Sequence, residues 1–283
     1  MKNQINKMNK FKFTANNIAA RLLEVAEAFG LPAKNKILFE NYGKYLFEIQ
    51  LILKNLEDGT RILDVGGGMG VNLLCIQRLV NQDLKLHLVD RFEEYTEENR
   101  MGPSDRGLKL MGEAKISVIT QDFWLNAKLP FKSDFFDVVT IFAVIEHLPG
   151  HPLRLLREIG RVLKHNGKLI LGGPNSVSLV KKVKLFFGKH PYIPFDLWIA
   201  DKYYSHYREY NRKEYRRLLE LSGFKHIQTI MSLEHSKTRA LNRYRNCKHG
   251  LFTPITMGLY GIYISHILLP SLRPSIYCIG EKI

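Results

Sequence analysis

Arg61-Ile-Leu-Asp-Val-Gly-Gly-Gly-Met-Gly70 joins a short apolar run to four glycines. A buried parallel strand has this form, because it is apolar along its length and ends at turn residues. Glycine has no Cβ, so the backbone at Gly66, Gly68 and Gly70 can approach a ligand closely. Apolar side chains then recur at helical spacing from Val71 to Leu79. The segment predicts a strand, a glycine turn and a helix, which together form the first unit of a nucleotide-binding α/β sheet.

The spacing of the glycines separates two kinds of nucleotide site. A dinucleotide-binding turn has the pattern G-x-G-x-x-G, but Val71 stands where the last glycine of that pattern would be. The acidic residue Asp64 lies two positions before Gly66. A tight turn without a ligand is the alternative reading of the glycines alone. The run Asp64-x-Gly66-x-Gly68-x-Gly70 resembles the first motif of the class I S-adenosylmethionine-dependent methyltransferases.

The resemblance extends over about residues 61–233 and the last predicted strand. The phrase Arg157-Glu-Ile-Gly-Arg-Val-Leu-Lys-His-Asn-Gly-Lys168 is similar to the same family. The resemblance implies an α/β fold, with a seven-stranded, mainly parallel Rossmann-like sheet, an antiparallel last strand and helices on both faces. Apolar runs place the strands after the first at residues 84–90, 116–120, 135–142, 168–172, 224–233 and 275–280.

Two regions are predicted along the chain. Residues 1–57 form a basic tail and then helices, the first over residues 15–29. In the family such helices cover the sheet edge and often act as a lid over the active site. Residues 58–283 form the methyltransferase domain, with insertions at about 174–206 and 234–272. Insertions after strand ends are where α/β enzymes build substrate pockets.

The composition is that of a globular protein with a basic surface. The 283 residues carry 42 Lys and Arg against 27 Asp and Glu, a formal net charge of +15. This excess favours an anionic partner such as nucleic acid, a phosphorylated substrate or an acidic membrane, although the composition of the source organism would also explain it. Cys75, Cys247 and Cys278 are far apart and form no metal-ligand or redox pair by spacing. Because this cysteine usage fits a reducing compartment, the chain is predicted to be cytoplasmic.

The resemblance implies S-adenosylmethionine as the cofactor and assigns residues to its methionine portion. The glycine turn would contact that portion through Gly66, Gly67, Gly68 and Gly70. The strand-end residue Asp64 belongs to the same motif. The other assigned residues follow the next strands.

Asp90 ends the second predicted strand, where a carboxylate can accept hydrogen bonds from both hydroxyls of a ribose. The alternative is a strand-end acid facing water. By the resemblance, Asp122 would accept from the adenine amino group and Phe123 would pack on the ring, although an Asp at a loop start is also a common cap. Arg91 and Ala143 are assigned to the same cofactor site.

Two histidines are candidates for a general base. His147 follows Glu146 after the fourth predicted strand, and His206 lies in the insertion that leads to the last helix. Imidazole titrates near neutrality, so either ring could take a proton from a substrate hydroxyl. The alternative is that these residues only shape the loop or pack. Some quinone-ring O-methyltransferases carry an acid three residues before this Glu and are thought to bind a divalent metal there, but this chain has Ala143, so no metal is predicted.

Several acceptor classes remain open. The favoured reading is methyl transfer to a small-molecule, saccharide or lipid-linked acceptor, at an oxygen atom, because Pro174-Asn175 and Phe186-Phe187-Gly188 resemble methyltransferases of that sort. A quinone or other lipid acceptor is the second reading. RNA is ranked last, because the loop after the fourth strand lacks both an Asn/Asp-Pro-Pro-aromatic motif and a cysteine. A non-catalytic S-adenosylmethionine-binding protein that docks on membranes is the non-enzyme alternative.

Two segments are candidates for contact with an acidic membrane. Residues 179–188 form a basic amphipathic helix, which could instead be a lid packed on the domain. Residues 237–269 place basic residues beside an apolar run, which could instead pack on the core or form a dimer. The apolar run at 255–269 would be roughly 22 Å long as a helix, shorter than the ~30 Å core of a bilayer. The oligomeric state stays open.

Overall fold

A computed structural model of the 283-residue chain defines the fold. It describes residues 14–29, 36–80, 83–92, 105–123, 127–192, 195–199, 206–233 and 269–283, except the side chains of 36–40 and 197–198. The predicted basic tail and nearly all of the predicted membrane segment at 237–269 lie outside the described residues.

The seven predicted strands form one sheet in the order β3-β2-β1-β4-β5-β7-β6. β1 to β5 pair in parallel, and β7 is antiparallel to both of its neighbours. The predicted α/β fold with an antiparallel last strand is therefore confirmed. The strands are β1 (Arg61–Val65), β2 (Lys85–Asp90), β3 (Ser117–Thr120), β4 (Phe136–Phe142), β5 (Leu163–Pro174), β6 (Phe224–Ser232) and β7 (Ser275–Lys282).

The register brings the carboxyl ends of the central strands to one edge. Val65 at the end of β1 is level with Val89 of β2 and with Ile141 of β4. Asp90 of β2 is level with Thr120 of β3. In open parallel sheets, ligands bind outside this edge, where neighbouring connections diverge to opposite faces.

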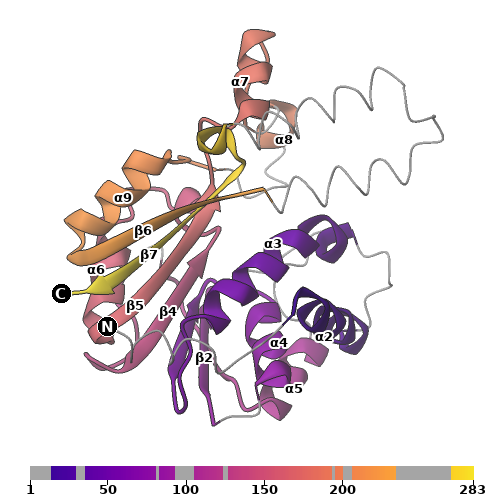
Figure 1. Ribbon diagram of the computed structural model, residues 1–283, viewed down its shortest axis with the longest axis vertical. Helices are drawn as coiled ribbons and strands as arrows, with labels where there is room; N and C mark the ends of the chain where they lie inside the picture. The colour runs from indigo at the N-terminus through magenta and orange to yellow at the C-terminus, as the bar shows by residue number, and fades with distance from the viewer. Residues whose placement is uncertain are drawn as a thin grey trace.

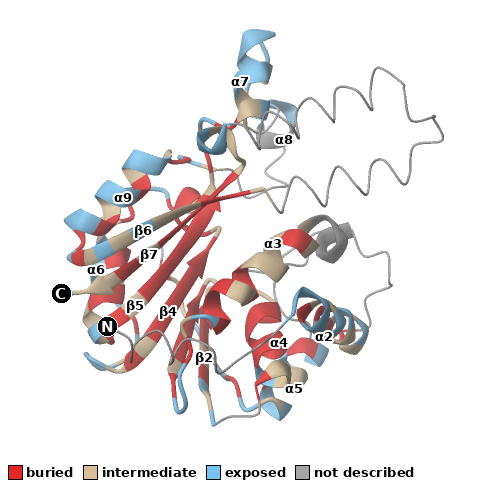
Figure 2. Cartoon of the chain, viewed as in Figure 1, coloured by how far each residue is buried: buried red, intermediate tan, exposed pale blue. Residues whose placement is uncertain are grey.

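Helices cover both faces of the sheet (Figure 1). Side chains alternate along β1, so Ile62 packs in one core and Leu63 and Val65 in the other. Figure 2 shows these buried strands between the two helical layers. The first layer contains α2 (Ala15–Ala28), α3 (Lys36–Leu53), α4 (Val71–Leu79) and α5 (Asp105–Glu113), and the second contains α6 (Leu153–Val162) and α9 (Arg212–Leu221).

Local sequence signals account for several element ends. Asn211 caps α9, and Glu214 completes the reciprocal capping box, as the Asn-x-x-Glu spacing favours. Asn166 and Gly167 lie at an irregularity inside β5, because Phe136 pairs with Leu163 while Val138 pairs with Lys168.

The insertion after β5 contains α7 (Leu179–Phe186) and α8 (Phe195–Ile199), which project from one end of the molecule (Figure 1). The predicted helix at 179–188 is confirmed. The alternative that it packs its apolar face on the domain is wrong, because α7 has no buried residue. Within the described part of the chain, no helix combines the length and apolar character needed to cross a membrane.

Candidate active site

The glycine turn lies at the carboxyl end of β1, against the loop that follows β4. Gly66 has φ +71°, a left-handed conformation that side chains other than glycine rarely adopt. A Cβ at Gly66 would lie 2.3 Å from Val144 Cγ2. Gly66 N donates to Val89 O at 2.8 Å, which ties the turn to β2. The turn therefore leaves no room for a side chain between the ends of β1 and β4.

Asp64 is buried beneath this turn. Thr140 Oγ1 donates to Asp64 Oδ1 at 2.7 Å, whereas Oδ2 has no hydrogen-bond partner among the described residues. A Cβ at Gly67 would lie 2.6 Å from Oδ2, so this oxygen faces the turn. Burial raises the pKa of Asp64 to about 7, although the Thr140 bond opposes the rise. A buried acceptor without a hydrogen bond lowers stability. A ligand that donates a hydrogen bond to Oδ2 would remove this cost.

Asp90 links the second strand to the same turn. Gly68 N donates to Asp90 Oδ2 at 2.8 Å, and Phe92 N donates to Oδ1 at 3.2 Å. Each carboxylate oxygen can accept more than one hydrogen bond, so both keep capacity for a ligand hydroxyl. Gln121 N donates to Asp90 O at 2.8 Å, which brings the loop after β3 to the same place.

The loop after β3 carries the predicted adenine residues. Arg91 Nε lies 3.9 Å from Asp122 Oδ2, so Asp122 stands beside the end of β2. Phe123 is 3 % exposed and belongs to the apolar core, so its ring is not an open platform in this structure. Its packing on adenine stays a prediction. The structure thus brings Asp64, Asp90 and Asp122 to the ends of three neighbouring strands.

Ala143 follows β4 in an unusual backbone conformation. Its φ is +53°, in the left-handed region that costs energy for a residue with a Cβ. Ala143 N donates to Gly172 O at 2.8 Å, which holds the conformation in place. The predicted cofactor residue therefore lies at the sheet edge, in a strained turn of the kind that often occurs at functional sites.

Helix α3 contributes a buried polar group that the sequence analysis missed. Glu48 is 1 % exposed and accepts from Tyr277 Oη at 3.2 Å and from Asn72 Nδ2 at 3.3 Å. Burial raises its pKa. Lys44, one turn earlier, lowers the pKa of both Asp64 and Glu146, which shows that α3 lies near both carboxyl groups. Apolar residues at helical spacing predict that α3 packs on the sheet, but they do not reveal which polar residue of α3 lies at the site.

The two candidate bases are neighbours. The rings of His147 and His206 are 4.7 Å apart between centroids, at 80° to each other. Glu146 and His147 lie in the short 3-10 helix η3 (Ile145–His147). Glu146 O accepts from Tyr207 N at 2.8 Å, which fixes the segment of His206 against η3. The loop after β4 and the segment before α9 therefore form one site.

His206 is held by Glu209, which forms an ion pair with Lys181. His206 Nδ1 lies 2.8 Å from Glu209 Oε1, and Lys181 of α7 contacts the other oxygen of Glu209. Lys181 Nζ also donates to Asn175 O at 3.0 Å. The side chain of Glu209 is 3 % exposed and that of Lys181 is 15 % exposed. Sequence analysis missed both partners, although the i,i+3 spacing of His206 and Glu209 is a local signal.

The protonation of His206 follows from this environment. Burial and the neighbouring His147 lower the pKa of His206 to about 3, so the ring is neutral near pH 7. A neutral imidazole beside a carboxylate places its proton on Nδ1, which leaves the lone pair on Nε2 as an acceptor. Burial lowers the pKa of Lys181 to about 8, so its ammonium form still dominates at neutral pH. The arrangement therefore presents a neutral imidazole whose Nε2 can accept a proton, although burial makes it a weaker base than free imidazole.

Glu146, His147 and His206 each offer one ligand atom, and these atoms lie within 4.8 Å of one another. Such a set could hold a divalent ion with His206 as the third ligand, in place of the acid that Ala143 replaces. The absence of a metal, expected from Ala143, stays a prediction. We expect EDTA to leave the rate of the purified protein unchanged. A rate that falls with EDTA and returns with Mg²⁺ or Zn²⁺ would contradict this prediction.

Glu146 is expected to make stability depend on pH. It is 1 % exposed, and burial raises its pKa from 4.5 to about 7. Between these pH values the folded state binds more protons than the unfolded state, so the free energy of unfolding falls as pH rises. Glu146→Gln removes this ionisation. We expect it to stabilise the protein at pH 8 by up to about 3 kcal/mol and to have little effect at pH 4.5, measured by urea unfolding in EDTA. An equal effect at both pH values would exclude this origin.

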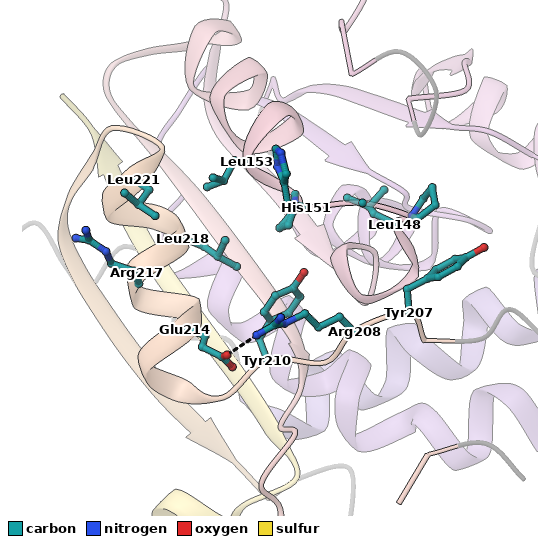
Figure 3. A pocket seen from close by; sticks show the side chains of 13 residues that line it. Leu148, His151, Leu153, Tyr207, Arg208, Tyr210, Glu214, Arg217, Leu218 and Leu221 are labelled. Carbon is teal, nitrogen blue, oxygen red and sulfur yellow. Dashed lines mark hydrogen bonds and ion pairs between the residues drawn. The ribbon is translucent and has the colours of Figure 1, made fainter.

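A cavity of about 560 Å³ lies between the start of α6 and α9. Figure 3 shows its lining side chains, with the ion pair between Arg208 and Glu214 at 2.7 Å on one wall. The lining begins one residue after His147 and one residue after His206. The described residues that line it include none of the predicted site residues, so this cavity is separate from the strand ends.

Comparisons with known proteins agree with this geometry. A family model described as "Methyltransferase domain" matches residues 39–229. An uncharacterized protein of Methanocaldococcus jannaschii is 32% identical over 157 residues, 51% of this chain and 59% of that protein. The ubiquinone/menaquinone biosynthesis C-methyltransferase UbiE of Azotobacter vinelandii is 29% identical over 153 residues, 52% of this chain and 57% of that protein. The chain thus matches less than two thirds of either relative's length.

Solved structures share the fold at low sequence identity. The phosphoethanolamine N-methyltransferase 2 of Haemonchus contortus, in complex with S-adenosyl-L-methionine, has a TM-score of 0.56 at 18% identity, over 98% of this chain and 59% of that chain. A SAM-dependent methyltransferase from Archaeoglobus fulgidus has a TM-score of 0.52 at 17% identity, over 87% of this chain and 99% of that chain.

Proposed function

We propose, because this chain belongs to the class I S-adenosylmethionine-dependent methyltransferases, that it methylates a hydroxyl oxygen of a saccharide or lipid-linked acceptor. Its cofactor is S-adenosylmethionine. The observation that carries the choice of oxygen is the buried pair of His206 and Glu209, which holds a neutral imidazole beside His147. A hydroxyl is a weak nucleophile, so it benefits from a base in a way that an amine or a carbanion does not.

The residues at the strand ends fit the cofactor. The unpartnered Oδ2 of Asp64 could accept from its amino group, and Asp90 has capacity for the ribose hydroxyls. The glycine turn lets the backbone approach the ligand without a Cβ. When bound, the cofactor supplies a methyl group on a positively charged sulfur, which is already electrophilic.

The remaining chemistry is positioning and proton transfer. Holding the acceptor oxygen in line with the methyl carbon can supply ~7–11 kcal/mol of rate acceleration. His206 Nε2 takes the hydroxyl proton, and the nearby carboxylate of Glu209 offsets part of the cost that burial imposes on the imidazolium that forms. Lys181 contacts Glu209 and so orients its carboxylate. In this proposal His206 is the base, Glu209 and Lys181 are positioning residues, and His147 lies beside the acceptor.

Carbon methylation of a hydroxylated quinone ring is a second candidate, supported by the similarity to UbiE over about half of the chain. The same base would serve, because removing the ring hydroxyl proton also increases the nucleophilicity of neighbouring ring carbons. The two candidates differ in the acceptor and in the atom that receives the methyl group.

Incubation with isotopically labelled S-adenosylmethionine and separate glycan, lipid, quinol and RNA fractions tests the proposal. We expect label in the glycan or lipid fraction, and NMR of the product should show an oxygen-bound methyl group. A carbon-bound methyl group would select the second candidate. Label in RNA, or cofactor binding without release of S-adenosylhomocysteine in any fraction, would overturn both.

Replacing Asp90 tests the cofactor site directly. Asp90→Ala removes the acceptor of Gly68 N and the predicted ribose ligand, so we expect the Kd for S-adenosylmethionine to rise ~10- to 100-fold, corresponding to charged hydrogen bonds of ~1.5–3 kcal/mol. Calorimetry measures the change. Asp83→Ala is the matched control, because Asp83 precedes the other end of β2 and its side chain is 86% exposed. Equal Kd values for the two variants would remove Asp90 from the site.

A further inference from the structure

The outer surface of α7 carries apolar side chains exposed to solvent. Phe186 is 84% exposed and Phe187 is 69% exposed, and their rings meet edge to face at 5.3 Å. Val180, Val183 and Leu185 of the same segment are also exposed. Figure 2 shows α7 as an exposed projection at one end of the molecule. Contiguous apolar surface of this kind marks an interaction site in a soluble domain.

The charge of the segment indicates what it meets. Residues 176–195 contain four lysines and no acidic residue. Lys182 and Lys189 are exposed beside the apolar side chains, whereas Lys181 is turned inward to Glu209. Phe195 of α8, which lies next to α7 in Figure 1, adds a third exposed aromatic ring at 68%. Aromatic rings beside lysines suit the surface of an anionic membrane, where the rings lie between headgroups and acyl chains and the lysines contact the headgroups.

The same helix is joined to the catalytic residues. Lys181 of α7 contacts Glu209, and Glu209 holds His206, so the outer surface of α7 and the candidate base are connected through one side chain.

We propose that α7 docks this protein on an anionic lipid surface, from which an amphiphilic acceptor reaches His206. The acceptor half of this inference rests on the proposed function, whereas the docking half does not. The docking surface is formed by Val180, Lys182, Val183, Leu185, Phe186, Phe187 and Lys189.

Vesicle co-sedimentation of the full chain tests the docking. We expect binding to vesicles of equal parts phosphatidylcholine and phosphatidylglycerol, and weak binding to phosphatidylcholine alone. The F186S/F187S variant should lower the partition coefficient at least about tenfold. The K182E/K189E variant should lower it by about fivefold or more for each lysine, an effect that high salt removes. The matched control is Leu108→Ser on α5, a leucine 43% exposed that should change nothing.

Two results would overturn the docking. One is vesicle binding by F186S/F187S equal to that of the Leu108→Ser control. The other is failure of the unaltered chain to bind anionic vesicles while it binds an acidic protein through Phe186 and Phe187. Circular dichroism and S-adenosylmethionine affinity should be unchanged in every variant, because α7 buries no residue of its own.

Delivery of the acceptor from the lipid surface is tested by a separate measurement, the methylation rate. With an acceptor embedded in anionic vesicles, F186S/F187S should lower the methylation rate by about the same factor as the partition coefficient. With the same acceptor dispersed in detergent, the rate should match that of the unaltered chain. Equal losses in both formats would overturn the delivery role. Absence of turnover in both formats would count against the proposed function, while the vesicle result would still decide the docking.

Discussion

His206→Gln is expected to lower kcat by ~10²- to 10⁴-fold, the usual contribution of a positioned general base. The Kd for S-adenosylmethionine should change less than about threefold, because His206 follows β5 and the predicted cofactor residues lie in or after β1 to β4. Glutamine can still bond to Glu209, so the variant keeps the local packing and removes only the basic nitrogen. Single-turnover kinetics with saturating cofactor measures the chemical step. A variant that keeps more than about a tenth of the unaltered rate would exclude His206 as the base.

Two companion variants separate the base from the residues that orient it. Glu209→Gln keeps the imidazole but weakens its alignment and its tautomer, so we expect a loss of kcat that does not exceed that of His206→Gln. His147→Gln should also cost less than His206→Gln, because His206 is the ring that lies against the carboxylate of Glu209. If His147→Gln gives the larger loss, the roles of the two histidines are reversed.

The pH profile gives an independent test of the same group. With its pKa lowered to about 3, His206 is neutral across the working range, so kcat should show no acidic limb near the usual pKa of His. On the alkaline side, Lys181 loses its charge near pH 8 and its hold on Glu209 weakens. Lys181→Arg should shift that alkaline limb upward, because guanidinium stays protonated.

The sequence was most informative where a feature is local. The glycine turn, Asp90 and the capping box at Asn211 each depend on residues within one connection, so their roles follow from spacing. The parallel register then brings Asp64, Asp90 and Asp122 together, because consecutive strands end at the same edge. This much of the cofactor site could be predicted.

The acceptor side depends on contacts between distant segments. Lys181 and Glu209 are 28 residues apart, and Glu48 and Tyr277 are 229 residues apart. The lysines of α7 share one helical pattern, and the pattern does not predict that Lys181 is turned toward Glu209 while Lys182 is exposed. Ala143 was assigned from its motif position, but its left-handed backbone is visible only in the structure. Periodicity predicts which elements pack, not which polar side chains meet.

Gly66→Ala is expected to give the largest loss of cofactor affinity, about 100-fold or more in Kd. Two costs combine at this position. The left-handed backbone at φ +71° costs a residue with a Cβ ~1–2 kcal/mol. The new methyl group would also lie 2.3 Å from Val144 Cγ2, so either the turn or the loop after β4 must move. Moving the turn displaces the backbone that is predicted to contact the cofactor, which calorimetry would detect as weaker binding.

Gly59→Ala is the matched control, because it separates backbone strain from steric conflict. Gly59 has φ +73° and a Cβ there would meet nothing within 4 Å. It should therefore cost ~1–2 kcal/mol of stability and leave the Kd for S-adenosylmethionine unchanged. Adding Val144→Ala to Gly66→Ala removes the conflicting Cγ2, so the double variant should recover part of the affinity but not the strain. If Gly59→Ala and Gly66→Ala change the Kd equally, the glycine turn does not contact the cofactor.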